Sequence, residues 1–260
     1  MRKPALYLLL GIGLFYSGIP SNCQDIHTTY TSTYGAIVRG DTSFKKLALV
    51  FTGDEYADGG IHIARVLNEQ GVKGSFFFTG NFYRNPEFEP LIQALFEDGH
   101  YLGAHSDQHL LYCDWIKRDS LLVTQKQFSD DLQDNYKAMG SFGIKKEDAL
   151  FFLPPYEWYN DAIANWTLAM GLQLINITYG TLSHADYTVP GSSGYRSSEE
   201  IFSSILEFET RGTSGLNGFV LLSHVGTAPE RTNKFYLYLE ILIEELGKRG
   251  YRFKRIDELL

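Results

Sequence analysis

One stretch of the chain, residues 98–109, reads DGHYLGAHSDQH, and the pattern around it decides the fold. Its middle, residues 101–104, is a short apolar run that begins two residues after Gly99, which predicts a buried strand. Apolar runs of the same kind occur on both sides of it. They predict further strands at residues 47–51, 74–78, 149–153, 172–177, 219–223 and 252–256. Seven strands are therefore expected from Lys45 onward.

Segments with helical periodicity fill the gaps between these runs. Several of them begin at a capping Asp, Asn or Ser and end at Gly. The expected helices cover residues 61–70, 86–98, 124–141, 161–170, 198–210 and 235–247. Alternating strands and helices indicate repeated βα units, and seven of them predict a single α/β domain built as a (β/α)7-type barrel. In such a barrel the functional residues collect on the loops after the strands.

The composition limits the classes of partner. The chain has 260 residues, of which 44% are hydrophobic, enough for a packed core. Its 23 Lys and Arg against 31 Asp and Glu give a net charge of −8. A surface with this excess of negative charge repels phosphate backbones, so nucleic acid is not expected as a partner.

The amino terminus has the pattern of a secretory signal peptide. Arg2 and Lys3 precede the apolar run 5–16, which is too short to span a bilayer comfortably. We expect cleavage after Cys23 and a secreted or periplasmic protein without a transmembrane span; a lipid anchor on Cys23 is the alternative. Residues 24–44 then form a polar lead-in, an edge strand or loose arm, and residues 45–260 form the domain. Only Cys113 remains in that domain, so no disulfide is expected within it.

Polar clusters follow four of the predicted strands, at residues 52–55, 105–109, 154–157 and 224. Because parallel strands end at the same face of a barrel, these clusters should converge. His105 and His109, four residues apart at a strand end, can both reach one divalent ion, and a carboxylate from a neighbouring strand would complete a three-ligand site. On its own, such a spacing also arises by chance on a helix face.

Three segments together resemble the polysaccharide deacetylases of the NodB-homology type, carbohydrate esterase family 4. They are GSFFFTG at residues 74–80, DGHYLGAHS at residues 98–106 and LPPY at residues 153–156. The likeness runs from about Lys46 to the end of the chain. It implies a distorted (β/α) barrel, a zinc or similar divalent ion, and His105 and His109 as two of the metal ligands.

The resemblance breaks down after the first predicted strand. Family members usually carry two aspartates there, one as general base and one as metal ligand. An alignment without gaps places Thr52 and Gly53 at these positions, whereas a shifted loop places Asp54 and Glu55 there. We expect Asp54 as the third metal ligand and Glu55 as the base, with the two roles exchangeable. A solvated loop carboxylate is the alternative for Glu55.

A second departure is Leu153, which stands where the family has an arginine that tethers the base. The base could therefore have moved, with Glu157 and Asp107 as further candidates. The resemblance implies that the backbone N–H of Tyr156 helps to hold the oxyanion and that His224 is the general acid.

The likeness also bears on residues beyond these segments. Asp186 lies near the position of an Asp-Trp segment of the family. Trp158, Tyr159 and Tyr187 could then form the wall of an acyl or sugar pocket, or could equally belong to the core.

The function expected from this pattern is metal-dependent removal of acetyl groups from N- or O-acetylated sugars of a polysaccharide. Two alternatives remain at this stage. One is a catalytically inactive carbohydrate-binding barrel, and the other is a metal-dependent hydrolase of a different amide or ester. The pattern does not choose among polysaccharides or among divalent metals, and it leaves the oligomeric state open.

Overall fold

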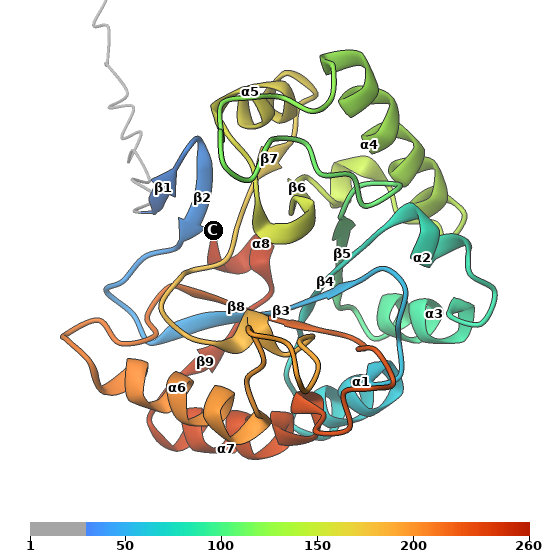
Figure 1. Ribbon diagram of the computed structural model, residues 1–260. Helices are drawn as coiled ribbons and strands as arrows, with labels where there is room; N and C mark the ends of the chain where they lie inside the picture. Colours follow the sequence, from blue (N-terminus) through green and yellow to red (C-terminus); the bar gives the residue numbers. More distant parts are fainter. Residues whose placement is uncertain (1–29) are drawn as a thin grey trace, which may run out of the picture.

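The computed structural model describes residues 30–260, in which a curved mixed sheet is surrounded by helices (Figure 1). The predicted signal peptide, residues 1–23, lies outside the described residues. The strands are β1 (Thr31–Thr33), β2 (Ala36–Arg39), β3 (Lys46–Gly53), β4 (Ser75–Phe78), β5 (Tyr101–Ala104), β6 (Phe151–Phe152), β7 (Gln173–Leu174), β8 (Phe219–His224) and β9 (Arg252–Phe253). The helices are α1 (Gly60–Glu69), α2 (Gly80–Arg84), α3 (Glu89–Glu97), α4 (Gln125–Gly140), α5 (Asp161–Ala169), α6 (Ser198–Thr210), α7 (Leu239–Lys248) and α8 (Ile256–Leu259).

The parallel part of the sheet follows the expected order of βα units. Strands run in the order β1-β2-β8-β3-β4-β5-β6-β7, and β9 pairs with the start of β3. All pairs are parallel except β1 with β2 and β2 with β8. This arrangement confirms the predicted α/β barrel of the (β/α)7 type.

The polar lead-in contains a hairpin that joins the sheet. Strand β2 pairs with β1 along one edge; along its other edge Arg39 pairs with Phe219 of β8, and Ile37 forms a parallel bridge with Ile175 just after β7. The Asn176 N–H donates to the Ile37 carbonyl, and the Thr178 hydroxyl donates to the Val38 carbonyl. An edge strand was one of the two expectations for this segment; the structure places β1 at the edge, and β2 lies against both ends of the parallel sheet.

Side chains alternate strictly along the central strands. In β3, Leu47, Leu49 and Phe51 belong to the apolar layer between sheet and helices, whereas Ala48 and Val50 belong to a second cluster on the inner side of the sheet. Neighbouring strands follow the same rule, with Phe76 and Phe78 outward and Phe77 inward. This period of two fixes which side chains at the strand ends face inward.

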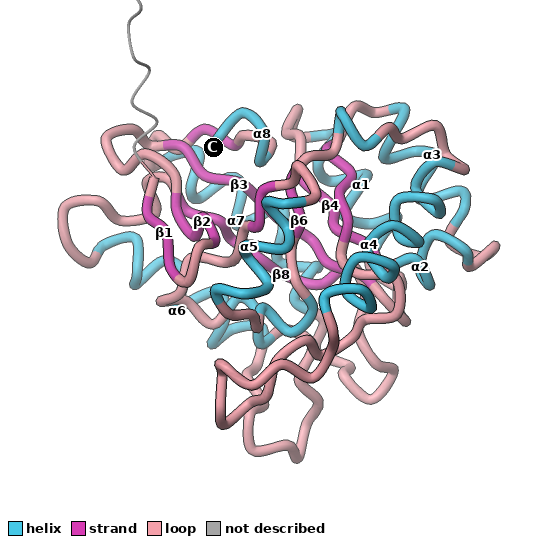
Figure 2. The backbone as a smooth tube through the Cα atoms, turned by 90° about the horizontal axis from the view of Figure 1, so that it is seen from above, coloured by secondary structure: helices cyan, strands magenta, loops and turns pink. Residues whose placement is uncertain are grey.

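The two longest connections follow the carboxyl ends of strands, at residues 105–124 after β5 and 175–197 after β7, and residues 225–234 follow the carboxyl end of β8. Figure 2 shows long loops gathered at one end of the molecule. Among residues 30–260, no helix has both the length and the apolar character needed to cross a membrane.

Candidate active site

Four polar side chains continue the inward alternation at the carboxyl ends of the strands. Thr52 lies two residues beyond Val50, Thr79 lies two beyond Phe77, and His224 lies two beyond Leu222. His105 stands in the same phase after Tyr101 of β5. Thr52, Thr79 and His105 are buried and His224 is partly buried, so the predicted convergence of strand ends places these groups in one region.

The two histidines of the opening stretch lie together. Their ring centroids are 5.2 Å apart, and left-handed backbone at Ser106 (φ 74°) and His109 (φ 53°) bends the loop between them. The His105 Nδ1 lies 2.8 Å from the Leu153 carbonyl, so this nitrogen carries the proton and Nε2 keeps its lone pair. Burial lowers the pKa of both histidines, which keeps them neutral as metal ligands must be.

Two buried side chains of helix α4 form hydrogen bonds with this loop. Asn135 accepts a hydrogen bond from the His105 backbone N–H at 2.9 Å. Asp131 accepts from the hydroxyls of Ser106 and Tyr112, both at 2.7 Å, and from the Gln108 N–H at 3.0 Å. These partners fix the loop that carries both histidines.

The two carboxylates expected beyond β3 diverge. Asp54 accepts a hydrogen bond of 2.7 Å from the Thr79 hydroxyl and lies near enough to His109 to oppose the lowering of that histidine's pKa. Glu55 is exposed, and its carboxyl lies beside the hydroxyl of Tyr56. The structure therefore brings Asp54, but not Glu55, toward the histidine pair.

The donor types at this position suit a divalent ion, since two neutral imidazoles and a carboxylate are common ligands of zinc and similar metals. However, no three His, Cys, Asp or Glu side chains between residues 30 and 260 form a cluster that could hold a metal ion. His105 and His109 are adjacent with Asp54 nearby, and the three do not form a closed ligand set.

The gapless alignment assigns Thr52 and Gly53 to the family aspartates, and side chains at these two positions point to opposite faces of the sheet. The Thr52 side chain faces inward, and its hydroxyl is buried without a hydrogen-bond partner. A Cβ at Gly53 would point the other way, to within 2.7 Å of Val225 Cγ1 and 2.9 Å of both Phe78 and Phe82. Strand β3 itself thus delivers no carboxylate to the site.

His224 forms a carboxylate–imidazole pair that the sequence did not predict. Its Nδ1 lies 2.6 Å from Asp186 Oδ1, and its backbone N–H donates to Asp186 Oδ2 at 2.9 Å. Burial alone would lower the pKa of His224, but the attraction and hydrogen bond of Asp186 outweigh it and raise that pKa. The only sequence signal was the approximate family position of Asp186. Tyr187 lies against the ring of His224, with centroids 5.1 Å apart.

The turn after β6 brings aromatic rings to the histidine pair. The exposed ring of Tyr156 lies 4.5 Å from that of His109, and Trp115 lies 5.5 Å from both Tyr156 and Trp158. We call Trp115, Tyr156 and Trp158 the aromatic edge. The Tyr156 N–H has no acceptor among residues 30–260 and is free to donate. Tyr159, expected as a pocket wall, is instead buried and donates to the Thr33 carbonyl.

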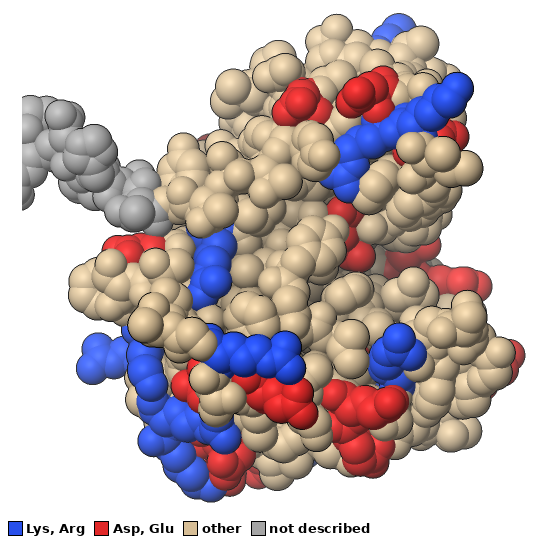
Figure 3. All heavy atoms as spheres, turned by 60° about the vertical axis from the view of Figure 1, so that its left-hand side comes forward, with Lys and Arg blue, Asp and Glu red and all other residues tan. Residues whose placement is uncertain are grey.

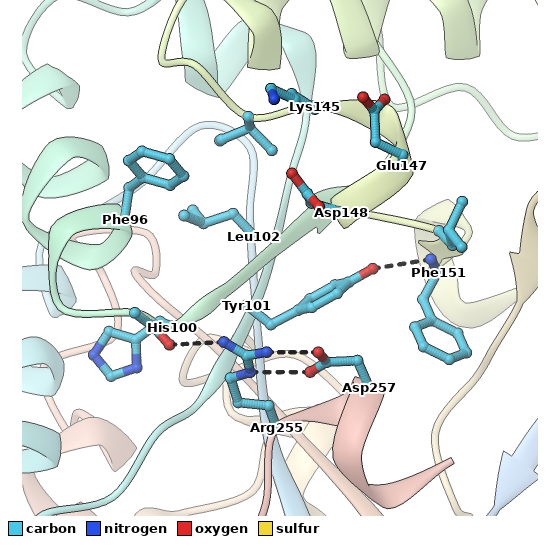
Figure 4. A pocket seen from close by; sticks show the side chains of 13 residues that line it. Phe96, His100, Tyr101, Leu102, Lys145, Glu147, Asp148, Phe151, Arg255 and Asp257 are labelled. Carbon is cyan, nitrogen blue, oxygen red and sulfur yellow. Dashed lines mark hydrogen bonds and ion pairs between the residues drawn. The ribbon is translucent and has the colours of Figure 1, made fainter.

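Two other features of the surface lie apart from this site. A hollow of about 510 Å³ lies at the amino ends of β5 and β6, lined by residues such as Tyr101, Phe151 and Arg255. Some of its polar groups pair with one another, as Figure 4 shows for Arg255 with Asp257 and for the Tyr101 hydroxyl with the Phe151 N–H. Acidic and basic side chains are interleaved on the face in Figure 3.

Comparison with known proteins gives the context of this geometry. Residues 39–175 match the polysaccharide deacetylase family. The peptidoglycan-N-acetylmuramic acid deacetylase PdaA of Bacillus subtilis is 25% identical over 232 residues, which cover 87% of this chain and 76% of that protein. A chitin deacetylase of Arthroderma benhamiae is 24% identical over 88% of this chain and 56% of its own length.

Solved structures agree on the fold. The structure of Bacillus subtilis PdaA, a family 4 carbohydrate esterase, superposes with a TM-score of 0.68 at 23% identity, covering 87% of this chain and 85% of that one. A pseudoenzyme of the same esterase family from Bacillus anthracis gives 0.65 at 18% identity, covering 88% and 69%. With half of its length matched and its histidine loop in place, the chain belongs to the polysaccharide deacetylase family.

Proposed function

We propose that the protein is a secreted hydrolase that removes acetyl groups from N- or O-acetylated sugars of a polysaccharide with the help of one divalent ion, zinc in the first place. The observation that carries this proposal is the arrangement of the His105–His109 pair, the Asp186–His224 pair and the free Tyr156 N–H at one end of the barrel. Names of the relatives support an acetylated glycan as the substrate.

In this proposal His105 and His109 hold the ion and Asp54 supplies the anionic ligand. The bound ion would polarise the acetyl carbonyl and make water more acidic. The orientation of His105 by the Leu153 carbonyl supports this role, because a ligating histidine normally donates its other ring N–H to a fixed acceptor.

Different residues of the chain would then accept the proton from water and donate a proton to the leaving group. A carboxylate takes a proton from water as the oxygen attacks the acetyl carbon, and the Tyr156 N–H stabilises the negative charge on the carbonyl oxygen. His224, protonated with the support of Asp186, gives its proton to the leaving nitrogen or oxygen as the bond to the acetyl carbon breaks. Acetic acid and a free amine or hydroxyl result.

A carbohydrate-binding barrel without activity is the second candidate. It is favoured by Thr52 and Gly53, which leave β3 without a carboxylate at the site. It predicts that the protein binds acetylated glycans and releases no acetate.

The test measures acetate release from chitin oligomers, peptidoglycan and acetylated xylan, with and without chelator. We expect release from at least one polymer and its loss on chelation. His105→Ala and His109→Ala should each lower bound metal, measured by elemental analysis. Glycan binding without release from all three polymers would favour the binding barrel, and full metal occupancy in both variants would remove the ion from this site.

Secretion has its own test. Mass spectrometry of the protein recovered from its natural source should show a chain that begins at Gln24. A mass increased by lipid on Cys23 would support the anchored alternative.

A further inference from the structure

The carboxylates around the site differ in the hydrogen bonds and ion pairs that they already form. Those of Asp54, Asp131 and Asp186 accept the hydrogen bonds described above from Thr79, from the histidine loop and from His224. Asp107, a candidate base from the sequence, is held by Arg84 through two contacts of 2.6 and 3.0 Å. Both oxygens of this carboxylate are thus engaged by one guanidinium.

Glu157 is the exception. Its carboxylate accepts no hydrogen bond from residues 30–260, and it lies close enough to His224 and Asp186 to interact with both electrostatically. Glu55 also takes no part in these hydrogen bonds, but it lies at the surface beside Tyr56. Glu157 is therefore the carboxylate near His224 that remains available for a proton.

The backbone holds Glu157 in a conformation that favours glycine. Tyr156 and Glu157 have φ values of 61° and 52°, two successive left-handed residues with side chains. The Glu157 carbonyl accepts hydrogen bonds from Asn176 Nδ2 at 2.9 Å and from the Tyr179 hydroxyl at 3.3 Å, which fix the turn. Strain of this kind persists where the surrounding structure enforces it, and it clusters at functional sites.

The surroundings of the Glu157 carboxyl prepare it to exchange a proton near neutrality. Its charged and titratable neighbours are His224, Asp186, Tyr179 and Tyr187. Loss of water raises the pKa of Glu157 to about 7; Asp186 adds to this effect and His224 opposes it. A base with such a pKa is half ionised at neutral pH and still accepts a proton readily.

We propose that Glu157 is the general base of this protein, in place of the carboxylate that the family resemblance places at the end of the first strand. The proposal rests on the deacetylase function proposed above. Glu157 takes one proton from water while the water oxygen bonds to the acetyl carbon. The carbon–nitrogen bond then breaks with transfer of the His224 proton to nitrogen. Glu157 finally returns its proton to the neighbouring His224, so both groups are restored and acetic acid and an amine are released.

The test compares Glu157→Gln, Glu157→Gly and, as a control, Glu240→Gln, an exposed glutamate of α7. Glutamine keeps the shape and removes the charge, whereas glycine relieves the left-handed backbone and so preserves folding. Both changes at position 157 should lower kcat/KM by about 100- to 10,000-fold. Bound metal and thermal unfolding should match the parent in Glu157→Gln, and its rate should lose the rise around pH 7. The control should stay within a few-fold of the parent.

Failure of this assignment can be told apart from failure of the proposed function. An active parent with a Glu157→Gln variant within a few-fold of it overturns Glu157 as base and leaves the deacetylase function intact. Loss of activity in Glu55→Gln with retention in Glu157→Gln overturns it in favour of the exposed loop carboxylate. A parent that releases no acetate from any of the three polymers overturns both proposals.

Discussion

At Gly53, the neighbouring side chains leave no room for a Cβ. We predict that Gly53→Ala lowers the free energy of unfolding by about 1–3 kcal/mol, because its Cβ would clash with Val225 and Phe78. Gly53→Asp should cost more, since it also buries a carboxylate among apolar groups. Neither should raise metal affinity. Urea unfolding measures the effect, with Gly140→Ala as the control because a Cβ there meets open space.

A Gly53→Asp variant as stable as the parent, with tighter metal binding, would contradict this prediction. It would show that the loop can shift to the register of the family.

Asp186 determines the charge of His224, and we predict that Asp186→Asn moves the alkaline limb of the rate profile to lower pH. The protonated imidazole is the donor form, and it is lost as pH rises through its pKa. Asp186 raises that pKa, so removing its charge lowers it and the acid disappears at lower pH. The pH dependence of kcat measures this shift. Asp119→Asn, at an exposed position, is the control, and an unmoved limb would show that Asp186 only orients the ring.

At the scale of elements, helix α4 acts as the support of the histidine loop. We predict that Asp131→Ala lowers metal affinity by about 10- to 100-fold, because three hydrogen bonds that fix the loop are lost. Metal titration followed by calorimetry measures the change. Asp130→Ala, on the neighbouring exposed face of α4, should bind like the parent. Equal affinity in both variants would show that the loop keeps its shape without the helix.

Element patterns were predictable where they depend on local periodicity. Helix α6 spans Ser198–Thr210, as expected, with a capping box formed by Ser197 and Glu200. Strand β5 also has its predicted bounds. Strands β6 and β7 are reduced to two residues each, because pairing with neighbours rather than apolar content decides where a ladder ends.

The remaining features depend on contacts between distant segments. Strand β2 gains its place from Ile175 and Asn176, which lie more than 130 residues away in the chain. The Asp186–His224 pair and the position of the Glu157 carboxyl arise in the same way, from loops folded across the barrel. The residue types that make up a site are visible in the sequence, but the direction in which each side chain points follows from this long-range packing.

At the scale of the whole molecule, burial of His100 links stability to pH. Its Nδ1 accepts a hydrogen bond from the Gly74 N–H, and burial lowers its pKa to about 4. Since the unfolded state binds this proton near pH 6.5, stability is full above that value and falls as pH drops toward 4. We predict a loss of about 2 kcal/mol between pH 7.5 and pH 5 from this residue.

The measurement is urea unfolding at both pH values for the parent and for His100→Asn, whose side-chain oxygen can replace Nδ1 as acceptor. Between pH 7.5 and pH 5, the free energy of unfolding of the variant should fall by about 2 kcal/mol less than that of the parent. Glu157 acts in the opposite sense, because its raised pKa removes stability as pH rises toward about 7, but it is common to both proteins. Parallel profiles would mean that acid stability is controlled elsewhere.

The aromatic edge also makes the protein its own optical reporter. Two of the three tryptophans, Trp115 and Trp158, belong to this edge, and the third, Trp166, packs against Phe128 in the core. Indole emission depends on contact with water, so a sugar ring that stacks on the edge would shift the emission of the first two and leave the third unchanged. Occupancy by a glycan can therefore be followed without a label, and it can be followed in a variant that has lost all turnover.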